Sequence, residues 1–95
     1  MGFSDITFLH CFSNIILNTA SIHATMPINV PDNTTKSMKS LSDFLFYGSL
    51  QYEWKENKHN RYGQVEGKIV GGNLTVLCAT LGTNYQPDFE GNILF

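Results

Sequence analysis

Apolar residues recur at three- and four-residue spacing in three stretches of the chain, the pattern of amphipathic helices. The first helix is predicted over residues 5–17 and ends at Asn18. The second is predicted over residues 37–46 and the third over residues 74–81, and a glycine follows each of them closely. The apolar stripe predicted for the first helix consists of Ile6, Leu9, Phe12, Ile15 and Ile16.

A different period marks the strands. Apolar and polar residues alternate over residues 50–54 and again over residues 65–69, with a charged turn between them, which predicts an antiparallel hairpin. The third helix stands between the second of these strands and the apolar residues 93–95. Strand, helix and strand in this order predict a parallel pair with a right-handed crossover.

The stretch over residues 26–35 is polar and holds Pro27 and Pro31. It is predicted to be a linker or an extended crossing segment. We therefore expect a domain boundary here, with residues 1–28 before it, a linker over 29–36 and residues 37–95 after it.

Composition limits the function. The 95 residues carry a net charge of -2, so no global field attracts nucleic acid or an anionic membrane. No apolar run approaches the roughly 20 residues of a membrane span, and the N-terminus lacks the basic start of a signal peptide. Cys11 and Cys78 fall in apolar helical patterns, where they are expected to be small buried hydrophobes rather than a disulfide. We expect a cytoplasmic protein without nucleic-acid or membrane partners.

Ser4 is the first candidate for chemistry. A glycine, a bulky residue and a serine at the start of a helix match part of the nucleophile elbow, in which a tight strand-to-helix turn exposes the serine oxygen. The second glycine of the elbow is absent, since Ile6 stands there. Serine is also a common helix N-cap, and on this local pattern alone the N-cap is favoured.

The other candidates are weaker. Gly71, Gly72 and Asn73 open the third helix, where free N–H groups could hold a substrate carboxylate, although glycine here also suits an ordinary turn. His23 could line a cleft, while a structural histidine is the more common case. The histidines and cysteines lack metal-ligand spacing and there is no dinucleotide or phosphate-loop motif, so neither a metal nor a cofactor is predicted.

Several segments taken together resemble the LD-carboxypeptidases, the serine peptidase family that includes the microcin C immunity proteins. GFSDIT at 2–7 is similar to the family's nucleophile segment, and GKIVGGNLTVL at 67–77 to its Gly-Gly-Asn-Leu segment. LGT at 81–83 and PDFEGNILF at 87–95 follow in the family's order. IHATMP at 22–27 is similar to the stretch after the first helix but departs from the commoner His-Gly-Pro form.

The resemblance implies a Ser-Glu-His triad with Ser4 as the nucleophile and the backbone N–H of Asp5 in the oxyanion hole. In the family the glutamate directly follows the strand that ends here at Phe95, and the histidine lies much further on. Family members remove the terminal D-amino acid of the murein tetrapeptide by cutting an L,D bond in the cytoplasm. The chain would be an internal fragment of such an enzyme and would be inactive alone.

The implied fold class is α/β, with the end of a nucleophile-bearing α/β domain joined to the first strands and helix of a smaller mixed α/β C-terminal domain. Two alternatives remain open. The chain could be a non-catalytic remnant or assembly module whose open strand at residues 93–95 pairs with a second copy, giving a homodimer. It could also belong to the immunity-type hydrolases of peptide-nucleotide antibiotics.

Overall fold

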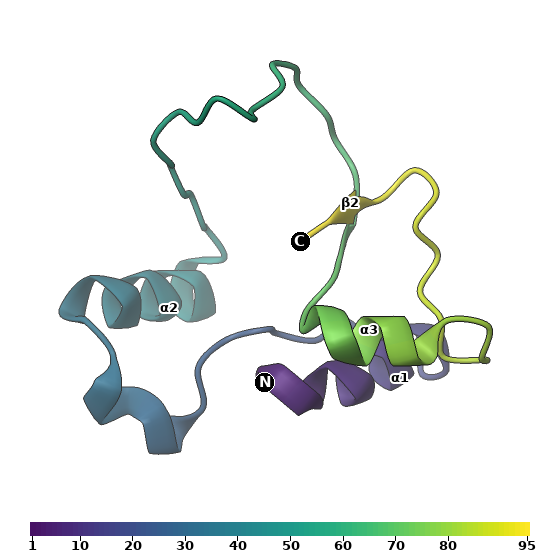
Figure 1. The fold of residues 1–95 in the computed structure, drawn as a ribbon. Helices are drawn as coiled ribbons and strands as arrows, with labels where there is room; N and C mark the ends of the chain where they lie inside the picture. The colour runs from purple at the N-terminus through teal and green to yellow at the C-terminus, as the bar shows by residue number, and fades with distance from the viewer. The chain divides into compact units, whose positions relative to one another are not determined.

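The computed structural model describes all residues from Met1 to Phe95. Along the chain its elements are η1 (Ser4–Ile6), α1 (Thr7–Ile15), η2 (Pro27–Asp32), α2 (Thr35–Tyr47), β1 (Ile69–Val70), α3 (Leu74–Thr80) and β2 (Ile93–Leu94) (Figure 1). They form two compact units. Unit 1 combines Met1–Met26 with Val65–Phe95, and unit 2 is Pro27–Gln64.

Unit 1 contains the strand–helix–strand arrangement predicted from the sequence. β1 and β2 pair in parallel, with Ile69 opposite Ile93 and Val70 opposite Leu94, and α3 lies between them in the chain. The Ile93 N–H donates to the Lys68 carbonyl over 2.8 Å. The fold is therefore a small mixed helix and strand piece with a parallel pair, compatible with the predicted α/β class.

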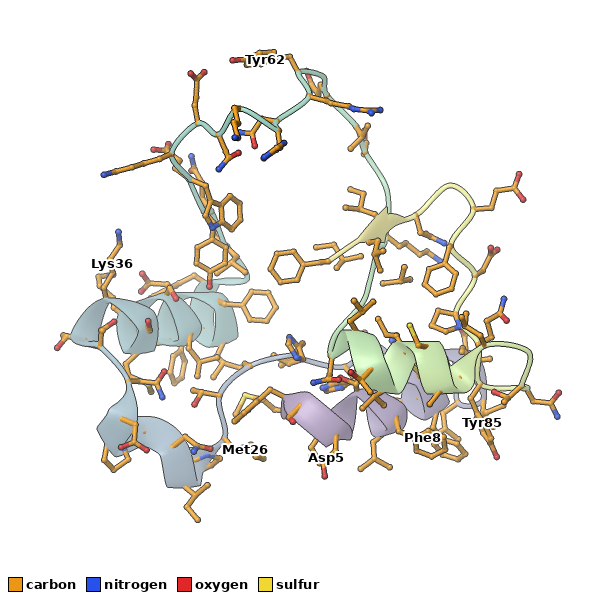
Figure 2. The ribbon with its side chains drawn as sticks, in the orientation of Figure 1. Asp5, Phe8, Met26, Lys36, Tyr62 and Tyr85 are labelled. Carbon is orange, nitrogen blue, oxygen red and sulfur yellow. The ribbon has the colours of Figure 1, made fainter.

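The core of unit 1 lies between α1 and α3, which run side by side (Figure 1). The buried residues of these two helices are Thr7, His10, Cys11, Leu77 and Thr80, and only Leu77 is a large apolar residue. At the outer edge the Phe8 ring packs edge-on against the Tyr85 ring, with 5.0 Å between centroids (Figure 2).

The apolar stripe predicted for the first helix is wrong in its rotation. Leu9 and Ile16 are about half exposed, whereas the buried face of α1 runs through Thr7, His10 and Cys11. The reason is that α3 packs on the face of Thr7, whose Oγ1 accepts a hydrogen bond from the Asn73 N–H at the start of α3. The predicted burial of Cys11 is confirmed, and that of Cys78 is wrong. Cys78 is one residue beyond the buried Leu77, about 100° further around α3. Both thiols are free, as predicted.

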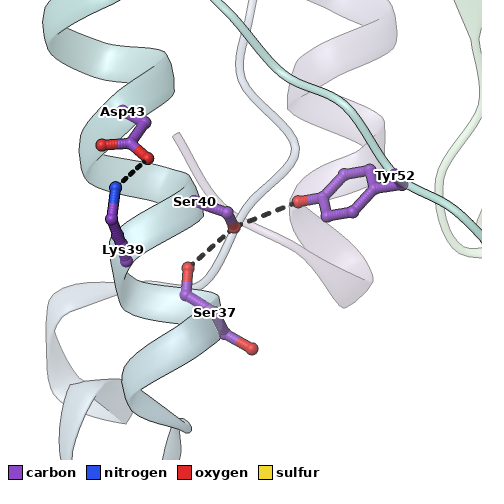
Figure 3. Close-up of polar contacts among 5 residues, drawn as sticks. All are labelled: Ser37, Lys39, Ser40, Asp43 and Tyr52. Atoms are coloured by element: carbon purple, nitrogen blue, oxygen red, sulfur yellow. Dashed lines mark hydrogen bonds and ion pairs between the residues drawn. The ribbon is translucent and has the colours of Figure 1, made fainter.

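Unit 2 contains η2 and α2. Thr34 caps α2, since its Oγ1 accepts from the Ser37 N–H over 3.1 Å, and Gly48 ends the helix with φ +68°. Lys39 and Asp43 form an exposed ion pair one turn apart, and the Ser40 hydroxyl lies 3.3 Å from the Tyr52 hydroxyl (Figure 3). The Ser40–Tyr52 contact holds the start of the following segment near α2.

Two predictions for this part of the chain are wrong. The hairpin over residues 50–69 does not form, because residues 49–68 include no strand and nearly all of their side chains are exposed. Only its turn is present, closed by the Asn60 N–H donating to the Asn57 carbonyl over 2.9 Å. Residues 27–32 form the 3₁₀ helix η2, which tolerates Pro27 at its start, so the extended crossing segment predicted as one alternative for residues 26–35 is wrong, and the linker stays a prediction. The predicted domain limits at residues 28 and 36 stay predictions.

None of the helices has the length and hydropathy needed to cross a lipid bilayer.

Candidate active site

The chain makes a strand–turn–helix passage over its first seven residues. Gly2 forms a parallel bridge with His23, in which the Gly2 N–H donates to the Ile22 carbonyl over 3.1 Å and the Ala24 N–H to the Gly2 carbonyl over 3.0 Å. Phe3 is extended, and η1 begins at the next residue. This is the local path of a nucleophile elbow.

Ser4 stands at the turn itself. Its φ is +58°, a left-handed conformation that costs a non-glycine residue roughly 1–2 kcal/mol. The residue is exposed, and its hydroxyl forms no hydrogen bond. The N-cap role favoured by the local pattern is therefore wrong, because Phe3 precedes η1 and no side chain caps it. A strained, exposed and unbonded hydroxyl is typical of a functional position rather than a structural one.

Gly2 explains how the turn forms without the second glycine of the motif. A Cβ added to Gly2 would lie 2.7 Å from Cγ2 of Ile6. The Ile6 side chain thus occupies the space that a side chain at Gly2 would need. One glycine on the strand side is enough for the helix to start against the strand.

The turn at Ser4 leaves the backbone N–H of Asp5 without a hydrogen-bond acceptor. Neither the backbone nor a side chain of the chain accepts a hydrogen bond from it. Asp5 is exposed at the start of the helix, where Figure 2 labels it. A free N–H next to an exposed serine hydroxyl is what an oxyanion hole requires.

Two histidines pack behind the elbow. The buried His10 has its Nε2 3.0 Å from the Gly2 carbonyl oxygen. Since a carbonyl only accepts, His10 Nε2 carries the proton and donates it. The His23 ring stands edge-on to His10, with 5.8 Å between centroids. Partial burial lowers the pKa of His23, and the neighbouring His10 lowers it further.

The Gly-Gly-Asn segment also reaches this region. The Asn73 N–H donates to Thr7 Oγ1 over 2.9 Å, and a Cβ on Gly72 would lie 2.5 Å from the same oxygen. Gly72 has φ +134°. Gly71 lies so close to the Phe95 backbone that a side chain there would meet its carbonyl oxygen. Asn73 caps α3 as the sequence predicts, its Oδ1 accepting from the Val76 N–H over 3.2 Å.

The structure therefore brings Gly72 and Asn73 against the first turn of α1. It places His23 beside Gly2, two residues before Ser4. The sequence interpretation missed His10 and Thr7. Both lie on the buried face of α1, three residues apart, and a polar pair at helical spacing was the available indication. No group of histidine, cysteine, aspartate and glutamate side chains is arranged to hold a metal ion. A shallow hollow over residues 40–51 of unit 2 includes none of the predicted site residues.

Comparison with known proteins agrees with these segments. Residues 66–95 match the family described as LD-carboxypeptidase C-terminal domain. Over 99 residues the chain is 31% identical to the "Probable murein peptide carboxypeptidase" of Bacillus subtilis (strain 168), covering 99% of this chain and 31% of that protein.

Two further relatives bear carboxypeptidase names. The protein from Synechocystis sp. is 32% identical over 94 residues, covering 99% of this chain and 30% of the relative. The protein from Rickettsia conorii is 29% identical over 103 residues, covering 100% and 32%. No solved structure matches the chain. The chain spans about a third of the length of the curated relatives it matches. These matches and the segments described above support the identification of the chain as a piece of an LD-carboxypeptidase family protein.

Proposed function

We propose that the chain carries the nucleophile segment of a serine carboxypeptidase that cleaves the L,D-peptide bond of the murein tetrapeptide. The observation that carries the proposal is the conformation of Ser4, left-handed and exposed with an unbonded hydroxyl at a strand-to-helix turn. The relative from Bacillus subtilis, whose name refers to murein peptides, supports the substrate class. We further propose that the reaction takes place in the cytoplasm.

In the proposed reaction Ser4 Oγ attacks the scissile carbonyl carbon. Its proton passes to a histidine, and the negative charge that develops on the carbonyl oxygen is held by the Asp5 N–H. The C–N bond then breaks as the histidine gives the proton to the leaving amine, which departs as the free D-amino acid. Water hydrolyses the acyl-serine ester and restores the Ser4 hydroxyl.

The general base is proposed to lie outside these residues. His10 is engaged with the Gly2 carbonyl, and His23 forms no hydrogen bond with Ser4. The family resemblance implies that the glutamate and the histidine of the triad lie beyond Phe95, the glutamate directly after it and the histidine further on. The 95 residues alone are expected to be inactive, because without the base only binding and oxyanion effects remain.

The test is release of D-alanine from murein tetrapeptide by the full-length polypeptide. This term means a polypeptide of the relatives' length that includes these 95 residues. Ser4→Ala is expected to lower kcat by at least about a thousandfold. Ser42→Ala is the matched control, since Ser42 is also exposed and lies on α2, and it is expected to leave turnover unchanged. Undiminished turnover in Ser4→Ala would remove the proposal.

A further inference from the structure

His10 is a buried titratable residue that the proposed reaction does not use. It is 6% exposed, and its polar contact is the hydrogen bond from Nε2 to the Gly2 carbonyl. The contact spans eight residues and ties the second turn of α1 back to the strand residue before the elbow. A buried imidazole placed on a backbone carbonyl fixes that peptide plane.

The Gly2 carbonyl is fully occupied. It accepts from His10 Nε2 and from the Ala24 N–H, each over 3.0 Å. A carbonyl oxygen has two lone pairs, so these two donors leave none for a third. The peptide between Gly2 and Phe3 is thereby held on both sides, by α1 and by the segment around His23.

The occupied carbonyl has a consequence for the oxyanion donor. Residues 2–5 share one feature with a type II turn, the positive φ that this turn requires at its third residue, since Ser4 has φ +58°. In the closed turn the Asp5 N–H would bond to the Gly2 carbonyl. Phe3, at φ -146° and ψ -176°, keeps the turn open. Because His10 and Ala24 already occupy the Gly2 oxygen, closure gains no hydrogen bond and the Asp5 N–H stays free.

We infer that His10 is a positioning residue, which holds the Gly2 carbonyl so that Ser4 keeps its exposed conformation and the Asp5 N–H remains available to the oxyanion. The inference rests on the proposed serine carboxypeptidase function. It requires that Nε2 of His10 carry the proton that is donated to the Gly2 carbonyl.

The test compares two substitutions in the full-length polypeptide. His10→Leu removes the donor while keeping an apolar side chain in the core, and it is expected to lower kcat by about tenfold to a hundredfold with KM little changed, short of the loss of a whole oxyanion donor. His10→Gln keeps an N–H that can reach the carbonyl, and it is expected to recover most of kcat. Cys11→Ala is the matched control, since it truncates the neighbouring buried side chain of α1 without touching Gly2; it is expected to lower stability and keep kcat.

A nitrogen NMR spectrum of the histidine side chains gives a readout independent of turnover, and the Nε2–H tautomer is expected for His10. The other tautomer, or a kcat within about twofold of wild type in His10→Leu, would overturn the inference while leaving the proposed function in place. A full-length polypeptide that releases no D-alanine even when Ser4 is intact would instead overturn the proposed function, and the inference with it.

Discussion

Thr7 Oγ1 accepts a 2.9 Å hydrogen bond from the backbone N–H of Asn73, across 66 residues of chain. Thr7 is completely buried three residues after Ser4, and Asn73 is the N-cap of α3. This bond fixes the first turn of α3 on the first turn of α1. The start of α1, directly after the turn that carries the proposed nucleophile, is therefore held in place by the Gly-Gly-Asn segment.

Replacing Thr7 with valine tests this contact. Thr7→Val keeps the shape of the side chain but leaves the Asn73 N–H without its acceptor, so we expect the free energy of unfolding to fall by about 1–3 kcal/mol. Thr7→Ser keeps the hydroxyl and is expected to lose less. Urea denaturation of both variants provides the comparison, and a Thr7→Val variant as stable as wild type beside a destabilised Thr7→Ser variant would show that the methyl group matters and the hydrogen bond does not.

Replacing Gly72 is expected to lower the free energy of unfolding for two reasons, which a control variant can separate. Gly82→Ala meets open space at φ +73°, so it is expected to cost only the left-handed conformation, about 1–2 kcal/mol. Gly72→Ala has φ +134° and also drives a Cβ into Thr7, which should add about 1–3 kcal/mol. Thermal unfolding of the two variants measures the difference. A Gly72→Ala variant as stable as Gly82→Ala would contradict the close packing at Thr7.

His23 predicts a dependence of stability on pH. Burial and the neighbouring His10 lower its pKa below the ordinary value of 6.5, so the unfolded chain binds a proton more readily than the folded one. The contribution of His23 to stability is therefore complete above pH 6.5 and is lost as the pH falls through the lowered folded-state value. His23→Gln should reduce the fall in unfolding free energy between neutral and mildly acidic pH. An unchanged pH profile in this variant would argue against the His10–His23 contact.

The two cysteines are expected to differ in reactivity. Burial raises the pKa of Cys11 above its ordinary value of 9.0, and the side chain is 4% exposed, whereas Cys78 is exposed. A disulfide reagent should therefore modify one thiol quickly and the second only on unfolding, since the thiolate is the reacting form. Cys78→Ser should abolish the fast phase. Two equally fast thiols would show that α1 and α3 do not pack as described.

Helices α2 and α3 were largely predictable because each carries its own end signals. Asn73 caps α3, and Gly48 and Gly82 adopt the left-handed conformation that ends a helix. The parallel strand pair followed from the order of the elements. The alternating pattern predicted a hairpin that does not form, so alternation alone was not enough. Tyr52 and Trp54 contact each other, but no second strand covers them.

The candidate site was predictable only in part. The motif around Ser4 was visible, but its left-handed turn depends on Ile6 filling the space beside Gly2, which is a packing relationship. His10 was overlooked because its partner is a backbone carbonyl, and a carbonyl leaves no trace in the residue types. The rotation of α1 depends on where α3 packs, so Thr7 could not be placed in the core from its own helix.

The most direct measurement of the central proposal is covalent trapping. The full-length polypeptide would be treated with a fluorophosphonate, whose phosphorus is attacked by an activated serine oxygen with loss of fluoride, and then digested and mapped by mass spectrometry. The account predicts one phosphonylated residue, Ser4, together with loss of D-alanine release in proportion to labelling. Complete inactivation with the label on another serine, or full activity with Ser4 labelled, would contradict it.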